Sequence, residues 1–254
     1  MKGRSMTRFQ RLVKLGQVPS FLLSLFKPTV WGPLLHAHKR TKFDHDFSIS
    51  WSQCGEDLVL VALLEADKKL GTYVDVGAHH PDRFSVTRAL YERGWSGINI
   101  DADDQVRDAF VRKRPRDKFF VGAVGTNDYY DFYRSEEKAI STVRRDWMER
   151  YANAGFRFEA KKRVKGMKLR TILESMPARV DLLNVDIEGA DLDAIKSIEF
   201  DTLNENLWPE WIMVESYPPL ETALLIESID YLISKKYKVW VMLPMATILR
   251  RASN

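Results

Sequence analysis

The chain has 254 residues, 45% of them hydrophobic, which is enough for one sizeable core. Its single cysteine, Cys54, excludes an internal disulfide and a zinc site of several thiolates, and favours a reducing compartment such as the cytoplasm. The net charge of +4 is unevenly spread, because residues 1–42 hold nine Lys or Arg and no acid, which leaves 30 basic against 35 acidic residues elsewhere. An acidic body argues against a nucleic-acid enzyme, whose cleft would be basic.

Residues 1–46 are predicted to form a basic amphipathic extension to a main domain over residues 47–254. Apolar residues recur at roughly helical spacing in its first 15 positions, and basic side chains fall between them. A second apolar patch at 21–26 is too short to span a bilayer, which takes about 20 residues. Two interpretations stay open: an anchor on the anionic inner face of a membrane, or a helix packed on the body.

From residue 71 onward, short β-branched segments alternate with helical ones. Strands are predicted at 73–77, 97–101, 119–124, 181–186, 211–215 and 238–243, with a final run at 247–250. Helices are predicted at 84–93, 104–112, 169–176, 192–198 and 221–235. The middle, 127–168, is less regular and holds a predicted edge strand at 129–133 and a charged helix at 144–154. The alternation predicts a doubly wound, Rossmann-like α/β sheet with helices on both faces.

Four of the predicted strands carry an acid at or near their carboxyl ends: Asp75, Asp101, Asp186 and Glu215. In an open parallel sheet, ligands bind beyond these ends, near the point where the strand order reverses. One acid in such a place could be chance, but four predict a single cleft lined with carboxylates.

Residues 75–81 (DVGAHHP) form a turn after the first strand, in which Gly77 lets the backbone approach a ligand. The later glycines of the dinucleotide fingerprint are replaced, and Pro81 lacks the N–H that a pyrophosphate would use. A cofactor without phosphates, such as S-adenosylmethionine, has no such need. Asp75 would then meet its ammonium group, and Asp101 would accept both ribose hydroxyls.

Four segments together resemble the FkbM-type methyltransferases, and the match runs from about residue 47 to 250. They are residues 52–57 (SQCGED), 73–81 (YVDVGAHHP), 93–101 (RGWSGINID) and 181–189 (DLLNVDIEG). The resemblance implies the class I methyltransferase fold, S-adenosylmethionine as cofactor and, usually, O-methylation. It further implies acceptors such as sugars, glycolipids or polyketide natural products.

The turn, the strand ends and the resemblance together give eight candidate cofactor-binding residues. They are Gln53, Glu56, Asp75, Gly77, Ala78, Asp101, Ala102 and Ala123. For the segment before the first strand there is an alternative: Ser52 caps a helix whose first turn holds Glu56 and Asp57.

Methyl transfer to a hydroxyl needs alignment of its oxygen and, usually, removal of its proton. Glu188 or Asp186 is the candidate base or orienting group, and the alternative for Asp186 is that it caps the following helix. His80 is another candidate base because a histidine pKa lies near neutrality. Asp186, Glu188 and Glu215 could also hold a divalent metal, although the absence of a compact ligand motif favours organic ligands or water.

The predicted function is S-adenosylmethionine-dependent O-methylation of a sugar hydroxyl in a glycan, a glycolipid or a related natural product. One alternative is an NAD-dependent oxidoreductase, because an acid after the second strand suits any adenosine ribose. Another is an inactive binding module tethered to a membrane by the extension. No nucleic-acid partner is expected, and the oligomeric state stays open.

Overall fold

A computed structural model of the chain describes residues 49–67, 70–216 and 223–252. The amphipathic helix and the apolar patch predicted for the extension therefore lie outside the described residues. From Ser50 onward the chain belongs to one compact unit.

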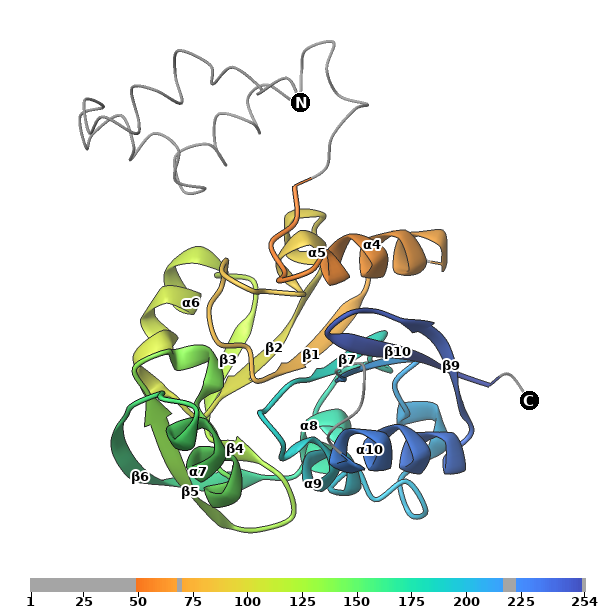
Figure 1. Cartoon of the computed structure of the whole chain (residues 1–254). Helices are drawn as coiled ribbons and strands as arrows, with labels where there is room; N and C mark the ends of the chain where they lie inside the picture. The colour runs from red at the N-terminus through yellow and green to blue at the C-terminus, as the bar shows by residue number, and fades with distance from the viewer. Residues whose placement is uncertain (1–48, 68–69, 217–222, 253–254) are drawn as a thin grey trace, which may run out of the picture. The chain divides into compact units, whose positions relative to one another are not determined.

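A seven-stranded sheet forms the centre of this unit (Figure 1). In spatial order its strands are β3 (Lys118–Val121), β2 (Ser96–Asp101), β1 (Thr72–Val76), β7 (Leu182–Val185), β8 (Trp211–Glu215), β10 (Ala246–Arg251) and β9 (Tyr237–Met242). The first five are parallel, and β10 runs antiparallel to both of its neighbours. The order reverses between β1 and β7, which confirms the predicted doubly wound sheet and places its switch point at these two strands.

Helices cover both faces of this sheet, as the sequence predicts (Figure 1). One face carries α4 (Glu56–Asp67), α5 (Arg88–Glu92) and α6 (Arg107–Lys113), and the other carries α8 (Leu169–Glu174), α9 (Asp191–Lys196) and α10 (Ala223–Ser234). Side chains of β1 alternate between the two cores, with Tyr73 on the α4 side and Val74 and Val76 on the other. Among the described helices, none is long and apolar enough to cross a bilayer.

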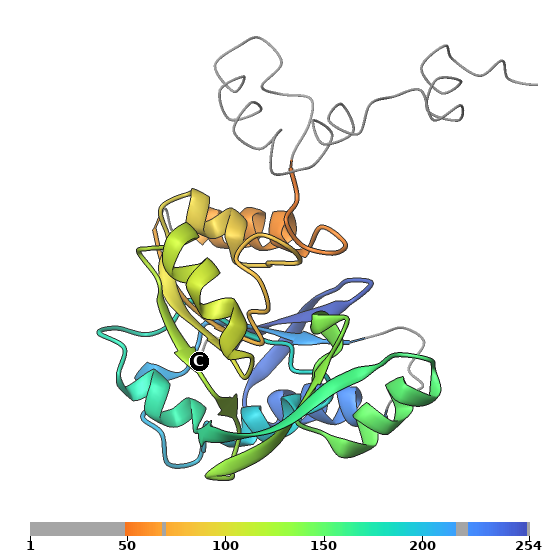
Figure 2. The ribbon, with the colours of Figure 1, turned by 90° about the vertical axis from the view of Figure 1, so that its left-hand side faces the viewer.

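The irregular middle of the chain forms a second, three-stranded sheet with the order β4-β6-β5. It comprises β4 (Ala123–Val124), β5 (Tyr129–Ser135) and β6 (Phe158–Met167), and α7 (Arg145–Asn153) joins β5 to β6. Figure 2 shows β5, β6 and α7 together as a layer beside the central sheet. The segment from β4 to β6 is called the insertion below. The strand predicted at 119–124 divides at Gly122 into β3 and β4, and β6 has no counterpart in the prediction.

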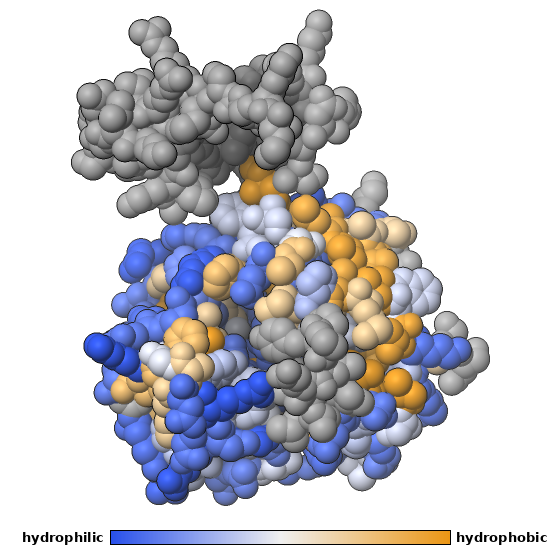
Figure 3. Space-filling model, viewed as in Figure 1, coloured by the Kyte–Doolittle hydropathy of each residue, from blue (hydrophilic) through white to orange (hydrophobic). Residues whose placement is uncertain are grey.

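The edge strand β9 carries the large aromatic residue Trp240 at its surface. Its exposed fraction is 53%, and its ring stands edge-on to buried Trp211 with centroids 5.6 Å apart. Val239 and Met242 are exposed on the same strand. Figure 3 shows an apolar surface that runs from α4 to this edge of the sheet.

Arg114, at the end of α6, is fully buried beneath β1 and α5. Its Nε atom donates to Asp117 at 2.7 Å, and its terminal nitrogens donate to Tyr73, Ser85 and Thr87. Asp117 is buried as well, so the charge is compensated within this network. The network ties α6, β1 and the segment before α5 to one another.

Arg114→Met should destabilise the fold by about 3–5 kcal/mol, because it leaves buried acceptors and an acid without their cation. Urea unfolding followed by circular dichroism measures this change. Arg145→Met is the control: Arg145 is 77% exposed and pairs with exposed Glu149, so its loss should leave the unfolding midpoint nearly unchanged. Equal unfolding midpoints for the two variants would contradict the structural role of Arg114.

Candidate functional site

A cleft with two lobes opens at the carboxyl ends of β1, β2, β7 and β8. Including the space that is open to solvent at their mouths, the first lobe holds about 540 Å³ and the second about 630 Å³. The linings of the two lobes have five residues in common: Gly77, His79, Ala139, Asp186 and Glu188. These residues therefore mark the junction at which ligands in the two lobes would meet.

The turn after β1 is built around Gly77, which has a φ of +82°. A Cβ atom at this position would lie 1.7 Å from the carbonyl oxygen of Asp186, so no other residue fits without a shift of backbone. The N–H groups of Gly77 and Ala78 donate to the carbonyl of Ile100 at 2.9 and 3.1 Å. The turn is thus held against β2 and β7 and opens toward the cleft.

Asp101, at the end of β2, lines the first lobe together with Ala102 and Ala123. One carboxylate oxygen accepts from the N–H of His79 at 2.8 Å and the other from the N–H of Asp103 at 2.7 Å. Each oxygen accepts only one of these bonds and so has further capacity for a donor in the cleft. Burial raises the pKa of Asp101 to about 6.

Apolar side chains form part of the lining of the first lobe, among them Ile100, Val124 and Phe132. The insertion provides much of this wall, because residues 138–143 lie between β5 and α7 and line the lobe. A flat apolar wall beside a carboxylate suits a ligand that combines an aromatic ring with hydroxyl groups.

The second lobe is acidic, and its carboxylates come from the ends of β7 and β8. Asp186, Glu188 and Glu215 each place an oxygen within 4.8 Å of the other two. Burial raises the pKa of Glu188 to about 7, although its hydrogen bond from the Tyr151 hydroxyl at 2.5 Å opposes the rise. Asp186 faces the cleft, and its pKa is held well above the usual range. The larger cause is the limited access of solvent to its carboxyl group, and the second is repulsion from Glu188.

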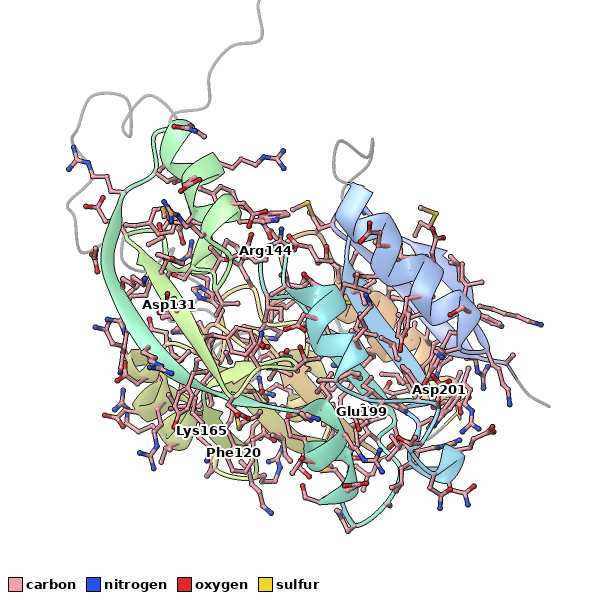
Figure 4. The ribbon with its side chains drawn as sticks, turned by 90° about the horizontal axis from the view of Figure 1, so that it is seen from below. Phe120, Asp131, Arg144, Lys165, Glu199 and Asp201 are labelled. Atoms are coloured by element: carbon pink, nitrogen blue, oxygen red, sulfur yellow. The ribbon has the colours of Figure 1, made fainter. Side chains whose placement is uncertain are left out.

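Glu188 has a φ of +52°, a conformation that costs a non-glycine residue on the order of 1–3 kcal/mol. The insertion holds it there: the Thr142 hydroxyl donates to the Glu188 carbonyl at 2.9 Å. Arg144, labelled in Figure 4, donates to the Gly189 carbonyl at 3.2 Å. Asp131 on β5 and Lys165 on β6 lie away from Glu199 and Asp201 near α9 and α10 (Figure 4).

Asp75, Ala78 and His80 are predicted site residues that line neither lobe. The Asp75 carboxylate points into the protein and accepts from Thr87 at 2.6 Å and from Asn184 at 2.9 Å. Ala78 packs in a small apolar cluster under α6. The Nδ1 atom of His80 accepts hydrogen bonds from backbone N–H groups within its own turn. This ring therefore stabilises the turn and does not line the cleft.

His79 lines both lobes instead of His80, and its ring stacks on Phe84 with centroids 6.3 Å apart. Burial and then the charge of Arg83 lower its pKa to about 4, so the imidazole is neutral at pH 7. Sequence reasoning missed Tyr151, which orients Glu188 from α7. No sequence motif contains Tyr151, because it lies far from Glu188 along the chain and only the fold brings the two side chains together.

Gln53, which precedes α4, and Glu56, its first residue, line the acidic lobe. Glu56 accepts from the N–H of Cys54 at 2.9 Å. Asp57 has a structural task instead: its carboxylate accepts from the hydroxyls of Ser50 and Ser52 at 2.7 and 2.8 Å. Asp57 thus stabilises the start of α4, whereas the neighbouring Glu56 lines the cleft.

Comparison with known proteins gives one family match. The sequence model described as Methyltransferase FkbM domain matches residues 75–239, more than half of the chain. No curated protein sequence matches.

Three solved structures are similar to this chain at low identity. Podospora anserina methyltransferase PaMTH1, bound to S-adenosylhomocysteine, is 10% identical with a TM-score of 0.45, and all of both chains is covered. A putative O-methyltransferase from Klebsiella pneumoniae is 10% identical with a TM-score of 0.42, over 92% of this chain and 96% of the other. The 1,6-didemethyltoxoflavin-N1-methyltransferase of Burkholderia thailandensis is 9% identical with a TM-score of 0.42, over 100% and 94%.

Asp101→Ala should weaken S-adenosylhomocysteine binding by about 1.5–3 kcal/mol, or roughly 10- to 150-fold, because charged hydrogen bonds to the ribose are lost. Isothermal titration calorimetry of the parent and the variant measures this. Asp108→Ala, at an exposed position on α6, should bind as the parent does. Equal affinities in all three proteins would remove Asp101 from the ribose site.

The affinity for S-adenosylhomocysteine should also fall as the pH drops through about 6. The raised pKa means that Asp101 is protonated below this value in the free protein, whereas donors on the ribose favour the ionised form. The affinity should be level above about pH 7 and should fall by up to tenfold per pH unit below 6.

Titrations from pH 5 to 8 test this dependence, with Asp101→Asn as the reference. The difference between the two profiles isolates Asp101 from Glu188, which titrates in the same range. Parallel profiles would show that Asp101 does not carry the dependence.

Proposed function

Because the chain belongs to the FkbM methyltransferase family and is a S-adenosylmethionine-dependent methyltransferase, we propose that it methylates a sugar hydroxyl of a glycan, a glycolipid or a related natural product. The observation that carries the proposal is the acidic lobe, which adjoins a lobe suited to adenosine and shares Asp186 and Glu188 with it. The family match favours this function over the oxidoreductase alternative.

The first lobe is proposed to hold the adenosine, with Asp101 on the ribose hydroxyls and Ala102 and Ala123 beside it. The cofactor supplies an electrophilic methyl group on sulfur. Gly77 leaves room for the remainder of the cofactor to pass toward the junction of the lobes.

Asp186 and Glu188 are proposed to hold the acceptor hydroxyl at this junction. They would receive the hydroxyl proton as its oxygen takes the methyl group that the bound cofactor would supply. Their role is to orient the hydroxyl by its proton, which aligns the oxygen for in-line attack. Tyr151 and the Thr142 contact support the role by fixing where Glu188 points.

The lining of the acidic lobe supports a neutral, hydroxyl-rich acceptor. None of the described residues that line it is Lys or Arg, so an anionic acceptor would meet only like charge. Carboxylates are strong acceptors for sugar hydroxyls, and Phe84 and Met213 offer apolar surface to the C–H face of a ring. Attachment of residues 1–46 to an anionic membrane and the domain boundary at residue 47 stay predictions.

Glu188→Gln should reduce methyl transfer by at least about 100-fold while S-adenosylhomocysteine binding changes by less than about threefold. The amide keeps the shape of the side chain but is a poor acceptor of the hydroxyl proton. Glu149→Gln, the same change at an exposed position on α7, is the control. Full activity of Glu188→Gln would exclude it from the reaction.

Product analysis tests the function itself. The purified full chain is incubated with methyl-labelled S-adenosylmethionine and a panel of free sugars, glycolipids and polysaccharides, and the product is examined by mass spectrometry and NMR. A methyl ether on a sugar carbon is expected. A methyl group on nitrogen or carbon would overturn the O-methylation, and turnover with NADH would revive the oxidoreductase alternative.

A further inference from the structure

We propose that the acidic lobe binds a hard divalent cation through Asp186, Glu188 and Glu215. Their three oxygens lie within 4.8 Å of one another. Oxygen ligands around Ca²⁺ stand at about 2.3–2.6 Å from the ion, so opposite ligands are about 5 Å apart. The spacing thus suits an ion of this size, and Mg²⁺ requires only a contraction of the cluster. Cation binding needs neither the methyl donor nor the acceptor, so it goes beyond the proposed function.

Glu56 provides a second and independent indication of a cation. Its side chain is only 3% exposed, and it lines the same lobe as the three acids. One of its oxygens accepts from Cys54, whereas Oε1 has no hydrogen-bond partner among the described residues. A buried carboxylate oxygen without a donor is unfavourable by several kcal/mol unless a cation or bound water compensates it.

The charges around the lobe favour an ion over a structural salt bridge. Four carboxylates from α4, β8 and the loop after β7 converge on one lobe, and no described residue of its lining carries a positive charge at pH 7. By contrast, the buried acid Asp117 pairs with the internal cation of Arg114. Hard oxygen ligands in this number are what Mg²⁺, Mn²⁺ and Ca²⁺ prefer.

The position of the cluster indicates a role for the cation in the reaction, and this role rests on the proposed function. Asp186 and Glu188 line both lobes, so an ion held by them adjoins the place proposed for the acceptor hydroxyl. An ion that also contacts this hydroxyl would lower its pKa and fix its direction.

Calorimetric titration of the full chain tests the site directly. The protein is stripped with EDTA, exchanged into metal-free buffer, and titrated separately with Mg²⁺, Mn²⁺ and Ca²⁺ in the absence of cofactor. We expect saturable binding of one ion per chain in at least one titration. Glu215→Gln and Glu56→Gln should each weaken it by about 10- to 100-fold.

The matched control is Glu174→Gln, an exposed acid on α8 that pairs with Arg170, and it should bind the ion as the parent does. Without metal, Glu215→Gln should melt at or above the temperature of the parent because repulsion is relieved. If Glu215→Gln no longer melts cooperatively, the affinity of Glu56→Gln for the ion is the deciding measurement.

No saturable binding of any of the three ions, or equal affinities in the parent, Glu215→Gln and Glu56→Gln, would overturn the proposal. S-adenosylhomocysteine binding is measured on the same sample. It succeeds or fails independently of the metal titration, so failure of the cation site and failure of the proposed function are distinguishable.

Discussion

The close approach of β1 and β7 at their carboxyl ends is the constraint on which the cleft depends. The N–H of Asp186 donates to the Val76 carbonyl at 3.0 Å, and Gly77 passes so near the Asp186 carbonyl that a side chain there is excluded. Because these ends are held together, the turns that follow them face one opening. The acids of β2, β7 and β8 converge on it, and the lobes share a junction instead of lying apart.

The insertion completes this arrangement from outside the sheet. Residues 138–143 form a wall of the first lobe, while Tyr151 and Thr142 fix the side chain and backbone of Glu188. A strained φ persists where its surroundings determine it from several sides, as they do here. The insertion therefore couples the shape of the first lobe to the position of an acid that both lobes share.

Acidic residues have two different roles in this protein. Asp75 and Asp117 accept hydrogen bonds from internal donors and stabilise the packing of β1 against α5 and α6. Asp101 and Asp186, by contrast, keep acceptor capacity toward the cleft at the expense of raised pKa values. This separation of structural from ligand-facing carboxylates is what makes an acidic cleft compatible with a stable fold.

The sequence by itself determined the doubly wound sheet, since strand and helix periods alternate and β-branched runs end in acids, and it located Gly77, Asp101, Asp186 and Glu188 through the family motifs. Only the tertiary structure decided which acids reach the cleft. Asp75 stands one residue before the end of β1, so strand alternation turns it inward, and His79 rather than His80 faces the opening. The Lys- and Arg-rich strand β6 and the hydrogen bond from Tyr151 to Glu188 depend on pairing and packing between distant segments, which local patterns do not encode.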